Sequence, residues 1–195
     1  MSAQELIERA AELRLAGIVV TDHHYQWPQA ELQAIAERTG HPDLVVLSAY
    51  ELTSSEPRTR QHAGDLLIYG SPDDATMPMW TCYEDAITIA RAHDALIISA
   101  HPFRQNAGAG DRVYHMDIDG LEIYNQNHSP LDVMRARTAA RKTGLIAVGG
   151  SDAHRVAQVA QFLTVFRRPV KTMEDFVREI RARRFALQSN RPDIS

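Results

Sequence analysis

Short, continuously apolar segments alternate along this chain with longer segments in which apolar residues recur at helical spacing. In residues 2–15, Leu6, Ala10 and Leu13 fall on one stripe, which predicts an amphipathic helix. We expect Gly17 to end this helix in the left-handed conformation that glycine adopts readily. The continuously apolar segments predict buried strands. These segments are residues 18–20, 44–47, 66–69, 96–99, 121–124, 145–148 and 162–166.

Helix signals separate several of these strands. Thr81 begins the T-x-x-E pattern of a capping box, and Ser129 begins a helix that Gly144 is expected to end. Thr172 is expected to cap the last helix, which runs to about residue 184. Buried strands separated by amphipathic helices are typical of an α/β protein whose mostly parallel sheet is covered by helices.

The composition is that of a globular protein with one domain. The chain has 195 residues, 44% of them hydrophobic and 24% charged, which is enough to bury a core without disulfides or a structural metal. Cys82 is the single cysteine, so a cysteine-rich zinc site is excluded and a reducing, cytoplasmic setting is expected. No apolar run approaches the roughly 18–20 residues of a membrane span, and no secretory signal is recognised at the start.

Charge and histidine content indicate the kind of chemistry to look for. The net charge is −4 at pH 7, and the chain has no basic tract that could follow a phosphate backbone. A nucleic-acid coat protein is therefore disfavoured, whereas an enzyme that acts on the end of a nucleotide chain is not. Nine histidines are many for a chain with one cysteine, and their positions point to candidate sites.

Residues able to bind metal ions follow at least four of the predicted strands. They are His23, Glu51, His101, Asp152 and His154. Because parallel strands direct the loops that follow them toward one rim, we expect these side chains to converge. Imidazole and carboxylate groups from separate strand ends form a suitable site for Zn, Mn or Fe.

Several other polar residues are open to two interpretations. His62 precedes its strand instead of following it, so its position alone does not decide whether it is a ligand. Glu122 ends a strand and either joins the site or pairs with an arginine. Arg104 and Arg155 lie near candidate ligands and are either solvated charges or clamps for a substrate phosphate. Ordinary surface or core roles are expected for His41, His93, His115 and His128.

The same residues carry a resemblance to a known family. In order along the chain, the motifs IVVTDH, YE, AHP, LEIYN and GSDAH, with His62 between the second and the third, resemble the successive motifs of the PHP superfamily, named for polymerase and histidinol phosphatase. The resemblance covers about residues 5–187. It implies a distorted, TIM-like seven-stranded β/α barrel that forms one domain over residues 1–195. Residues 155–195 would be its C-terminal strand-helix-strand segment.

The resemblance also implies which residues bind metal. In this family, a cluster of one to three divalent metal ions at the rim of the barrel hydrolyses phosphate esters. Carried over residue by residue, Glu51, His62 and His101 match one complete ligand set. His23 and His154 match a second set, which lacks its aspartate.

The chain departs from the family at the first strand of the barrel. The family opens with a strand that bears an H-x-H pair of metal ligands, and no such motif occurs here, so the first strand is expected to be missing. Asp152 with a bridging Glu51 is what this chain has of the ligand set that the H-x-H pair completes.

A divalent-metal-dependent phosphoesterase is the function that these features predict. Glu51, His101 and Asp152 form the expected catalytic set, and the partner is a small phosphate ester or a short nucleotide. Sugar phosphates, histidinol phosphate, nucleotide 5′ ends and phosphotyrosine all stay open as substrates. Two other classes also stay open: a non-catalytic module that binds a metal or a phosphate ligand, and an amidohydrolase-like enzyme that acts on C–N bonds.

Overall fold

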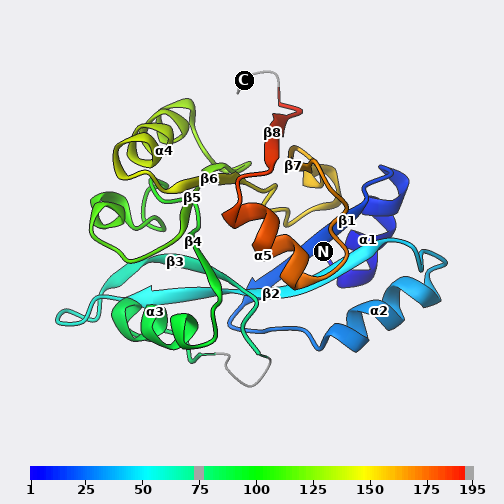
Figure 1. The fold of residues 1–195 in the computed structure, drawn as a ribbon, viewed down its shortest axis with the longest axis horizontal. Coiled ribbons are helices and arrows are strands. Elements are labelled where there is room, and N and C mark those ends of the chain that lie inside the picture. Colours follow the sequence, from blue (N-terminus) through cyan, green and yellow to red (C-terminus); the bar gives the residue numbers. More distant parts are fainter. Residues whose placement is uncertain (73–76, 192–195) are drawn as a thin grey trace.

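Six strands form one curled sheet in which each strand lies beside the next strand of the chain (Figure 1). The computed structural model describes residues 1–72 and 77–191, so the last four residues of the expected 155–195 segment lie outside it. The strands of the curled sheet are β1 (Gly17–His23), β2 (Val45–Ser55), β3 (His62–Tyr69), β4 (Leu96–Ser99), β5 (Gly120–Tyr124) and β6 (Ile146–Gly149). β7 (Phe162–Phe166) and β8 (Phe185–Ser189) pair with each other in a separate sheet.

Helices connect most of these strands. They are α1 (Ala3–Glu12), α2 (Gln29–Arg38), α3 (Tyr83–Ala92), α4 (Pro130–Thr143) and α5 (Met173–Arg181), with short 3-10 helices η2 (Gly110–Tyr114) and η3 (Val156–Gln158). Within the described ranges, none of the helices has the length and apolarity that crossing a membrane would require. The mixed α/β class that the sequence predicts is confirmed.

β3 reverses the direction of the sheet near its middle. The pairs β1–β2, β4–β5 and β5–β6 are parallel, whereas β3 is antiparallel to both β2 and β4. Residues 56–61, which join β2 to β3, are too few for the crossover connection that parallel strands require. The sheet is therefore a mixed, curled half barrel.

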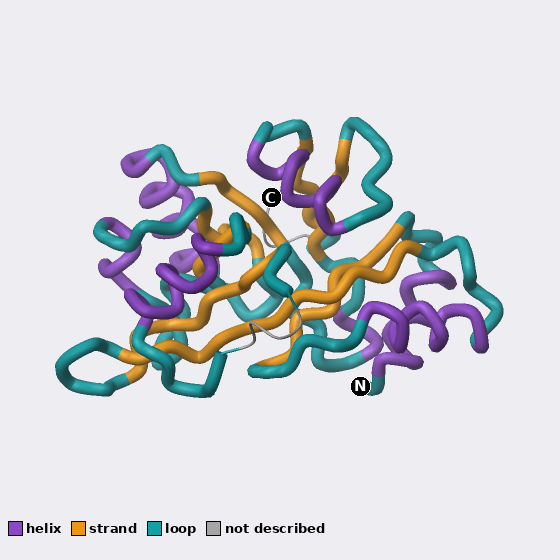
Figure 2. The backbone as a smooth tube through the Cα atoms, turned by 60° about the horizontal axis from the view of Figure 1, so that its bottom comes forward, coloured by secondary structure: helices purple, strands orange, loops and turns teal. Residues whose placement is uncertain are grey.

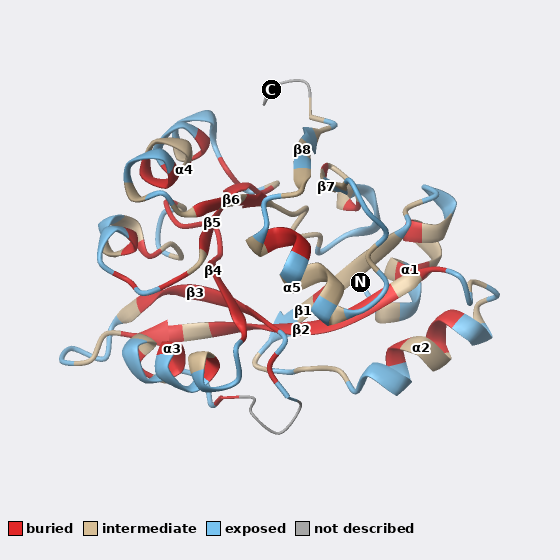
Figure 3. Cartoon of the chain, viewed as in Figure 1, coloured by how far each residue is buried: buried red, intermediate tan, exposed pale blue. Residues whose placement is uncertain are grey.

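Helices cover both faces of the sheet, and Figure 3 shows that its central strands are buried. Adjacent residues of a strand point to opposite faces. Ile97 belongs to the apolar cluster formed with α3 and α4, whereas Ile98 belongs to the cluster formed with Ile180 of α5. α1 and α2 pack against β1 and β2 through a third cluster that includes Leu32 and Val46. Figure 2 shows α5 and the β7–β8 pair on the other side of the sheet from α1 and α2.

A groove of about 1000 Å³ lies between the two edge strands of the half barrel, β1 and β6. Inward-pointing side chains of the sheet line the groove, among them Leu47, Leu67 and Ile98. Phe176 of α5 also lines it. The groove extends to His23 at the carboxyl end of β1. The open side of the half barrel therefore leads to the rim where the sequence places its candidate ligands.

Three of the predicted helix ends are confirmed. Ser129 caps α4 through a reciprocal capping box with Asp132, and Gly144 ends the helix with φ of +76°. At α5, the side chain of Thr172 accepts a hydrogen bond from the backbone N–H of Asp175. These local signals act as predicted because each satisfies a backbone group that the helix end leaves unpaired.

Two other predicted helix ends are wrong. Cys82, not Thr81, is the N-cap residue of α3, because the hydroxyl of Thr81 donates a hydrogen bond to the carbonyl of Pro78 in the preceding turn. At the end of α1, the left-handed residue is Arg14, with φ of +56°. Gly17 instead begins β1, where a Cβ atom would lie 2.6 Å from the carbonyl oxygen of Val45.

His128 is a buried histidine that is expected to make folding sensitive to acid. Its side chain is 2% exposed, its Nδ1–H donates to the carbonyl of Ile123, and its Nε2 has no partner among the described residues. Burial lowers the pKa of His128 from 6.5 to about 4. Because the fold favours the neutral ring, stability is fully present above pH 6.5 and is lost as the pH falls toward 4. The shift corresponds to about 3 kcal/mol.

We therefore expect His128→Asn to flatten the pH dependence of folding. In urea unfolding between pH 6.5 and 4.5, the free energy of unfolding of the variant should fall less steeply than that of the wild type, since the buried titrating ring is gone. His115→Asn, at an exposed position, is the matched control and should keep the wild-type slope. Equal slopes for His128→Asn and the wild type would contradict the assignment.

Candidate metal centre

β1, β2 and β3 bring three candidate ligands to one end of the groove. His23 lies opposite Glu51 in the parallel β1–β2 pair, and Glu51 lies opposite Leu67 in the β2–β3 pair. Asp65 comes two residues before Leu67 and therefore points to the same face. Because β3 is antiparallel, its beginning lies at the rim. Ligand atoms of His23, Glu51 and Asp65 lie within 4.8 Å of one another.

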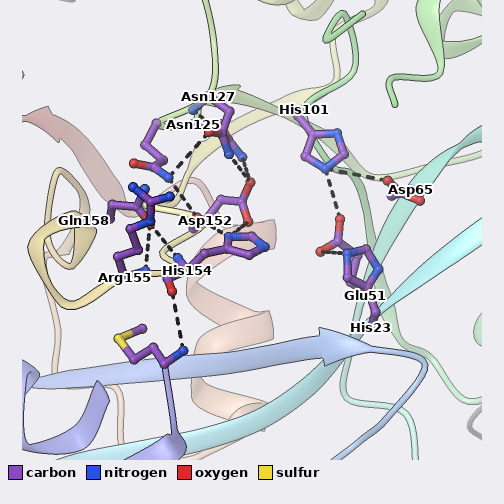
Figure 4. A network of polar contacts seen from close by, with 12 residues as sticks. His23, Glu51, Asp65, His101, Asn125, Asn127, Asp152, His154, Arg155 and Gln158 are labelled. Carbon is purple, nitrogen blue, oxygen red and sulfur yellow. Dashed lines mark hydrogen bonds and ion pairs between the residues drawn. The ribbon is translucent and has the colours of Figure 1, made fainter. Parts of the chain in front are cut away.

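His101 joins this group from the loop after β4. The backbone N–H of Ala100 donates to the carbonyl of Asp65, which holds the end of β4 beside β3. Nε2 of His101 lies 3.1 Å from Oε1 of Glu51 and 3.7 Å from Oδ2 of Asp65 (Figure 4). The other oxygen of Glu51, Oε2, lies 3.7 Å from Nε2 of His23. Glu51 thus has an imidazole nitrogen near each of its two oxygens.

The two carboxylates of this group are buried without a basic side chain. Glu51 is 6% exposed and Asp65 is 5% exposed, and within residues 1–72 and 77–191 only histidines form ion pairs with them. Burial lowers the pKa of His101, but the carboxylates of Glu51, Glu122 and Asp65 outweigh burial and raise it to about 9. Without a cation, the imidazolium of His101 therefore supplies the balancing positive charge.

This donor set fits a divalent cation. Imidazole nitrogens and carboxylate oxygens together are ligands of Zn, Mn and Fe in proteins. Buried carboxylates are costly unless they are paired or coordinate a metal, and a bound ion would replace the proton on His101. Glu51, Asp65, His101 and His23 are the residues that could hold such an ion.

A second group of candidate ligands lines the same groove, in the loop after β6. Oδ2 of Asp152 accepts hydrogen bonds from the side-chain amides of Asn125, at 3.1 Å, and Asn127, at 3.0 Å (Figure 4). Its other oxygen lies 3.5 Å from Nδ1 of His154. The structure therefore brings Asp152 and His154 together, and the two amides leave Oδ1 of Asp152 as the oxygen that faces His154.

The other predicted site residues lie at the margin of these groups. Nε2 of His62 lies 3.1 Å from Oδ1 of Asp65, so His62 contacts a candidate ligand. Nη1 of Arg104 lies 4.0 Å from Oδ2 of Asp152, and its side chain is 40% exposed. Arg155 is exposed in the loop that carries Asp152 and His154.

Asp65 was not predicted as a ligand from the sequence. The predicted strand spans residues 66–69, and ligands were expected beyond the carboxyl ends of strands. Asp65 instead lies inside an antiparallel strand whose start faces the rim. The available signal was a carboxylate directly before the apolar run Leu66 to Tyr69. An ionised residue in a strand that is otherwise buried needs a partner, and that need marks it as a candidate.

Comparisons with known proteins agree with this fold. Residues 130–185 match the family model described as PHP-associated. No curated protein matches the sequence. Over residues 130–185, this match agrees with the resemblance to PHP proteins that the motifs indicate.

Three solved structures show the same fold at low sequence identity. A protein of Bifidobacterium adolescentis assigned as a metal-dependent phosphoesterase has a TM-score of 0.60 and 17% identity, over 79% of this chain and 82% of that one. An amidohydrolase of Chromobacterium violaceum, with bound sulfate and no metal, has a TM-score of 0.65 and 17% identity, over 98% and 94%. The lesion-specific endonuclease Q of Pyrococcus furiosus has a TM-score of 0.60 and 14% identity, over 93% of this chain and 51% of that one.

Proposed function

We propose that this chain, a protein with a PHP-type fold and a PHP-associated C-terminal segment, is a divalent-metal-dependent phosphoesterase. The observation that carries the proposal is the buried cluster of Glu51, Asp65 and His101, with His23 beside it, at the end of an open groove. In the described ranges no lysine or arginine pairs with its carboxylates, and a divalent cation would replace the proton of His101 as their counter-charge. The proteins with similar folds include one assigned as a metal-dependent phosphoesterase.

Each residue of the site has a role in this proposal. Glu51, His101 and Asp65 would hold one ion, and Glu51 with Asp152 would help to hold a second. When bound, the divalent ions would supply an activated water and stabilise the attacking and leaving oxygens of the ester. Glu51, His101 and Asp152 are therefore the catalytic set, and one to three ions of Zn, Mn or Fe are the expected cofactors.

The charge of the site favours a phosphate group as its ligand. Neutral imidazole ligands leave part of the metal charge uncompensated, which attracts a phosphate dianion. Arg104, whose Nη1 lies 4.0 Å from Oδ2 of Asp152, and the exposed Arg155, three residues after Asp152, are proposed to hold the phosphate oxygens, since guanidinium groups match them in geometry.

The substrate class that we propose is a phosphomonoester or a short nucleotide. The fold is shared with endonuclease Q, of which this chain spans about half the length. With a net charge of −4 and no basic tract, this chain lacks the electrostatic means to hold a long duplex. The end of a nucleic acid therefore fits the site better than its interior.

We also propose that a further strand completes the half barrel. β1 and β6 are the two edges of the sheet, and an apolar groove lies between them. An unpaired strand edge next to an apolar groove is a site where another strand can pair. Such a strand would give the seven-stranded barrel that the family resemblance implies.

Hydrolysis of a phosphomonoester is the test of this function. Protein loaded with Mn²⁺ is expected to hydrolyse p-nitrophenyl phosphate, and EDTA should abolish the reaction. The double variant His101→Ala, Asp152→Ala should lower kcat/KM by more than about 100-fold, since even residues behind metal ligands contribute about 10–100-fold.

The control for this test is a second His and Asp pair. His115→Ala, Asp117→Ala alters exposed residues outside the groove and should keep full activity. Equal activity of the two double variants would place the reaction elsewhere. Metal binding without hydrolysis of any phosphate ester would instead favour the non-catalytic module, and hydrolysis of C–N bonds alone would favour the amidohydrolase-like alternative.

A further inference from the structure

Glu122 is a buried carboxylate that touches the backbone of a candidate ligand. It lies on β5, its side chain is 5% exposed, and the described residues include no lysine or arginine paired with it. Its Oε2 accepts a hydrogen bond from the backbone N–H of His101, at 2.9 Å. The same oxygen accepts a second hydrogen bond from Nδ2 of Asn125, at 2.9 Å.

Asn125 extends this contact to the second group of candidate ligands. Its Nδ2 also donates to Oδ2 of Asp152, at 3.1 Å. Its Oδ1 accepts from the backbone N–H of Asn127, at 2.8 Å, so every polar atom of the buried amide is used. A chain of hydrogen bonds therefore runs from His101 through Glu122 and Asn125 to Asp152.

The two residues at the ends of this series of hydrogen bonds, His101 and Asp152, have an uncommon backbone conformation. His101 has φ of +27° and Asp152 has φ of +45°. A positive φ is uncommon in residues other than glycine and costs backbone free energy, so contacts at such residues help to hold them. The N–H of His101 and the side chain of Asp152 are the groups that Glu122 and Asn125 hold. Gly150 allows the loop after β6 to lie close to Glu122, since a Cβ atom at position 150 would lie 3.2 Å from Oε1 of Glu122.

We infer that Glu122 and Asn125 are positioning residues that fix His101 and Asp152, which belong to different ion shells, at one separation. The inference rests on the proposed function, because it assumes that both residues are ligands. A rigid separation matters because two ions act on one phosphate only when they lie about 3.5–4 Å apart. Neither residue needs to touch metal or substrate for this role.

Manganese binding to this chain is the readout, measured by the EPR signal of free Mn²⁺ during a titration. Asn125→Leu, which keeps the branching of the side chain but removes its polar atoms, and Glu122→Met, which removes the oxygen that accepts both hydrogen bonds, should each weaken Mn²⁺ binding by about 10–100-fold, the usual effect of residues that orient metal ligands. His101→Ala gives the scale for the loss of a ligand.

A carboxylate with a purely structural role is the matched control. Glu179 on α5 is fully buried and accepts two hydrogen bonds from the guanidinium of Arg184, at 2.8 and 2.7 Å. Glu179→Met should lower the melting temperature and leave Mn²⁺ affinity within about twofold of the wild type, since Glu179 lies outside the network that orients the ligands.

The outcomes separate this inference from the function on which it rests. Wild-type protein that binds no Mn²⁺ or Zn²⁺ would overturn the proposed function and the inference with it. Wild-type affinity in Asn125→Leu or Glu122→Met, beside weakened binding in His101→Ala, would overturn the inference alone. Equal losses in Glu179→Met would show that the network only supports the fold. Should Asn125→Leu not fold, Glu122→Met decides.

Discussion

Glu51→Gln is expected to remove most of the bound metal and to lower kcat/KM for a phosphomonoester by more than about 100-fold. Glu51 lies between His101 and His23, with one carboxylate oxygen facing each imidazole. Glutamine keeps the size of the side chain but offers one oxygen in place of two, so it cannot bridge a pair of ions. Elemental analysis of protein purified without chelator measures the metal, and steady-state kinetics with added Mn²⁺ measures the rate.

The same substitution five residues further along the chain is the control. Glu56 forms an ion pair with Arg112, away from the candidate ligands, and Glu56→Gln should leave metal content and rate unchanged. Circular dichroism and thermal unfolding of the metal-free proteins establish that both variants fold. A Glu51→Gln protein that is folded, fully loaded and active would show that the cluster is not the metal site.

Asp65→Asn is expected to weaken metal binding more than His62→Ala does. Asp65 lies inside the cluster, whereas His62 contacts only the Oδ1 atom of Asp65 among the candidate ligands. Loss of a ligand should lower Mn²⁺ affinity by more than about 100-fold, and loss of a side chain that orients a ligand by about 10–100-fold. A competition titration against a fluorescent chelator measures both variants.

The family resemblance makes the opposite prediction for this pair of residues, because it assigns the ligand role to His62. If His62→Ala lost its metal and Asp65→Asn kept it, the resemblance would be right and the geometric assignment of Asp65 wrong. His93→Ala, which replaces an exposed histidine outside the groove, is the control for removing an imidazole.

The ends of helices could be predicted from the sequence where one local hydrogen bond decides where the helix begins. Ser129 and Thr172 cap their helices because each hydroxyl meets a backbone N–H within the same turn. Thr81 does not cap, since its hydroxyl has a nearer acceptor in the turn before the helix. The antiparallel direction of β3 depends on contacts between strands, which the periodicity of a single segment does not report.

The candidate site could be predicted in part for the same reason. His23, His101 and Asp152 follow parallel strands, so the rule that sites form beyond carboxyl ends applies to them. Asp65 lies in the reversed strand, where that rule points to the wrong end. Glu122 was recognised at a strand end but expected either in the site or beside an arginine, whereas it accepts from the backbone of His101. The sequence does not show which backbone groups a side chain will contact.

Anomalous scattering from a crystal of this chain grown with Mn²⁺ or Zn²⁺ locates the bound ion without assuming any activity. The strongest peak is expected between Glu51, Asp65 and His101. A weaker peak beside Asp152 and His154 is expected, since that group offers fewer protein ligands. A strongest peak away from Glu51, or no peak in a well-ordered groove, would contradict the assignment of the metal centre.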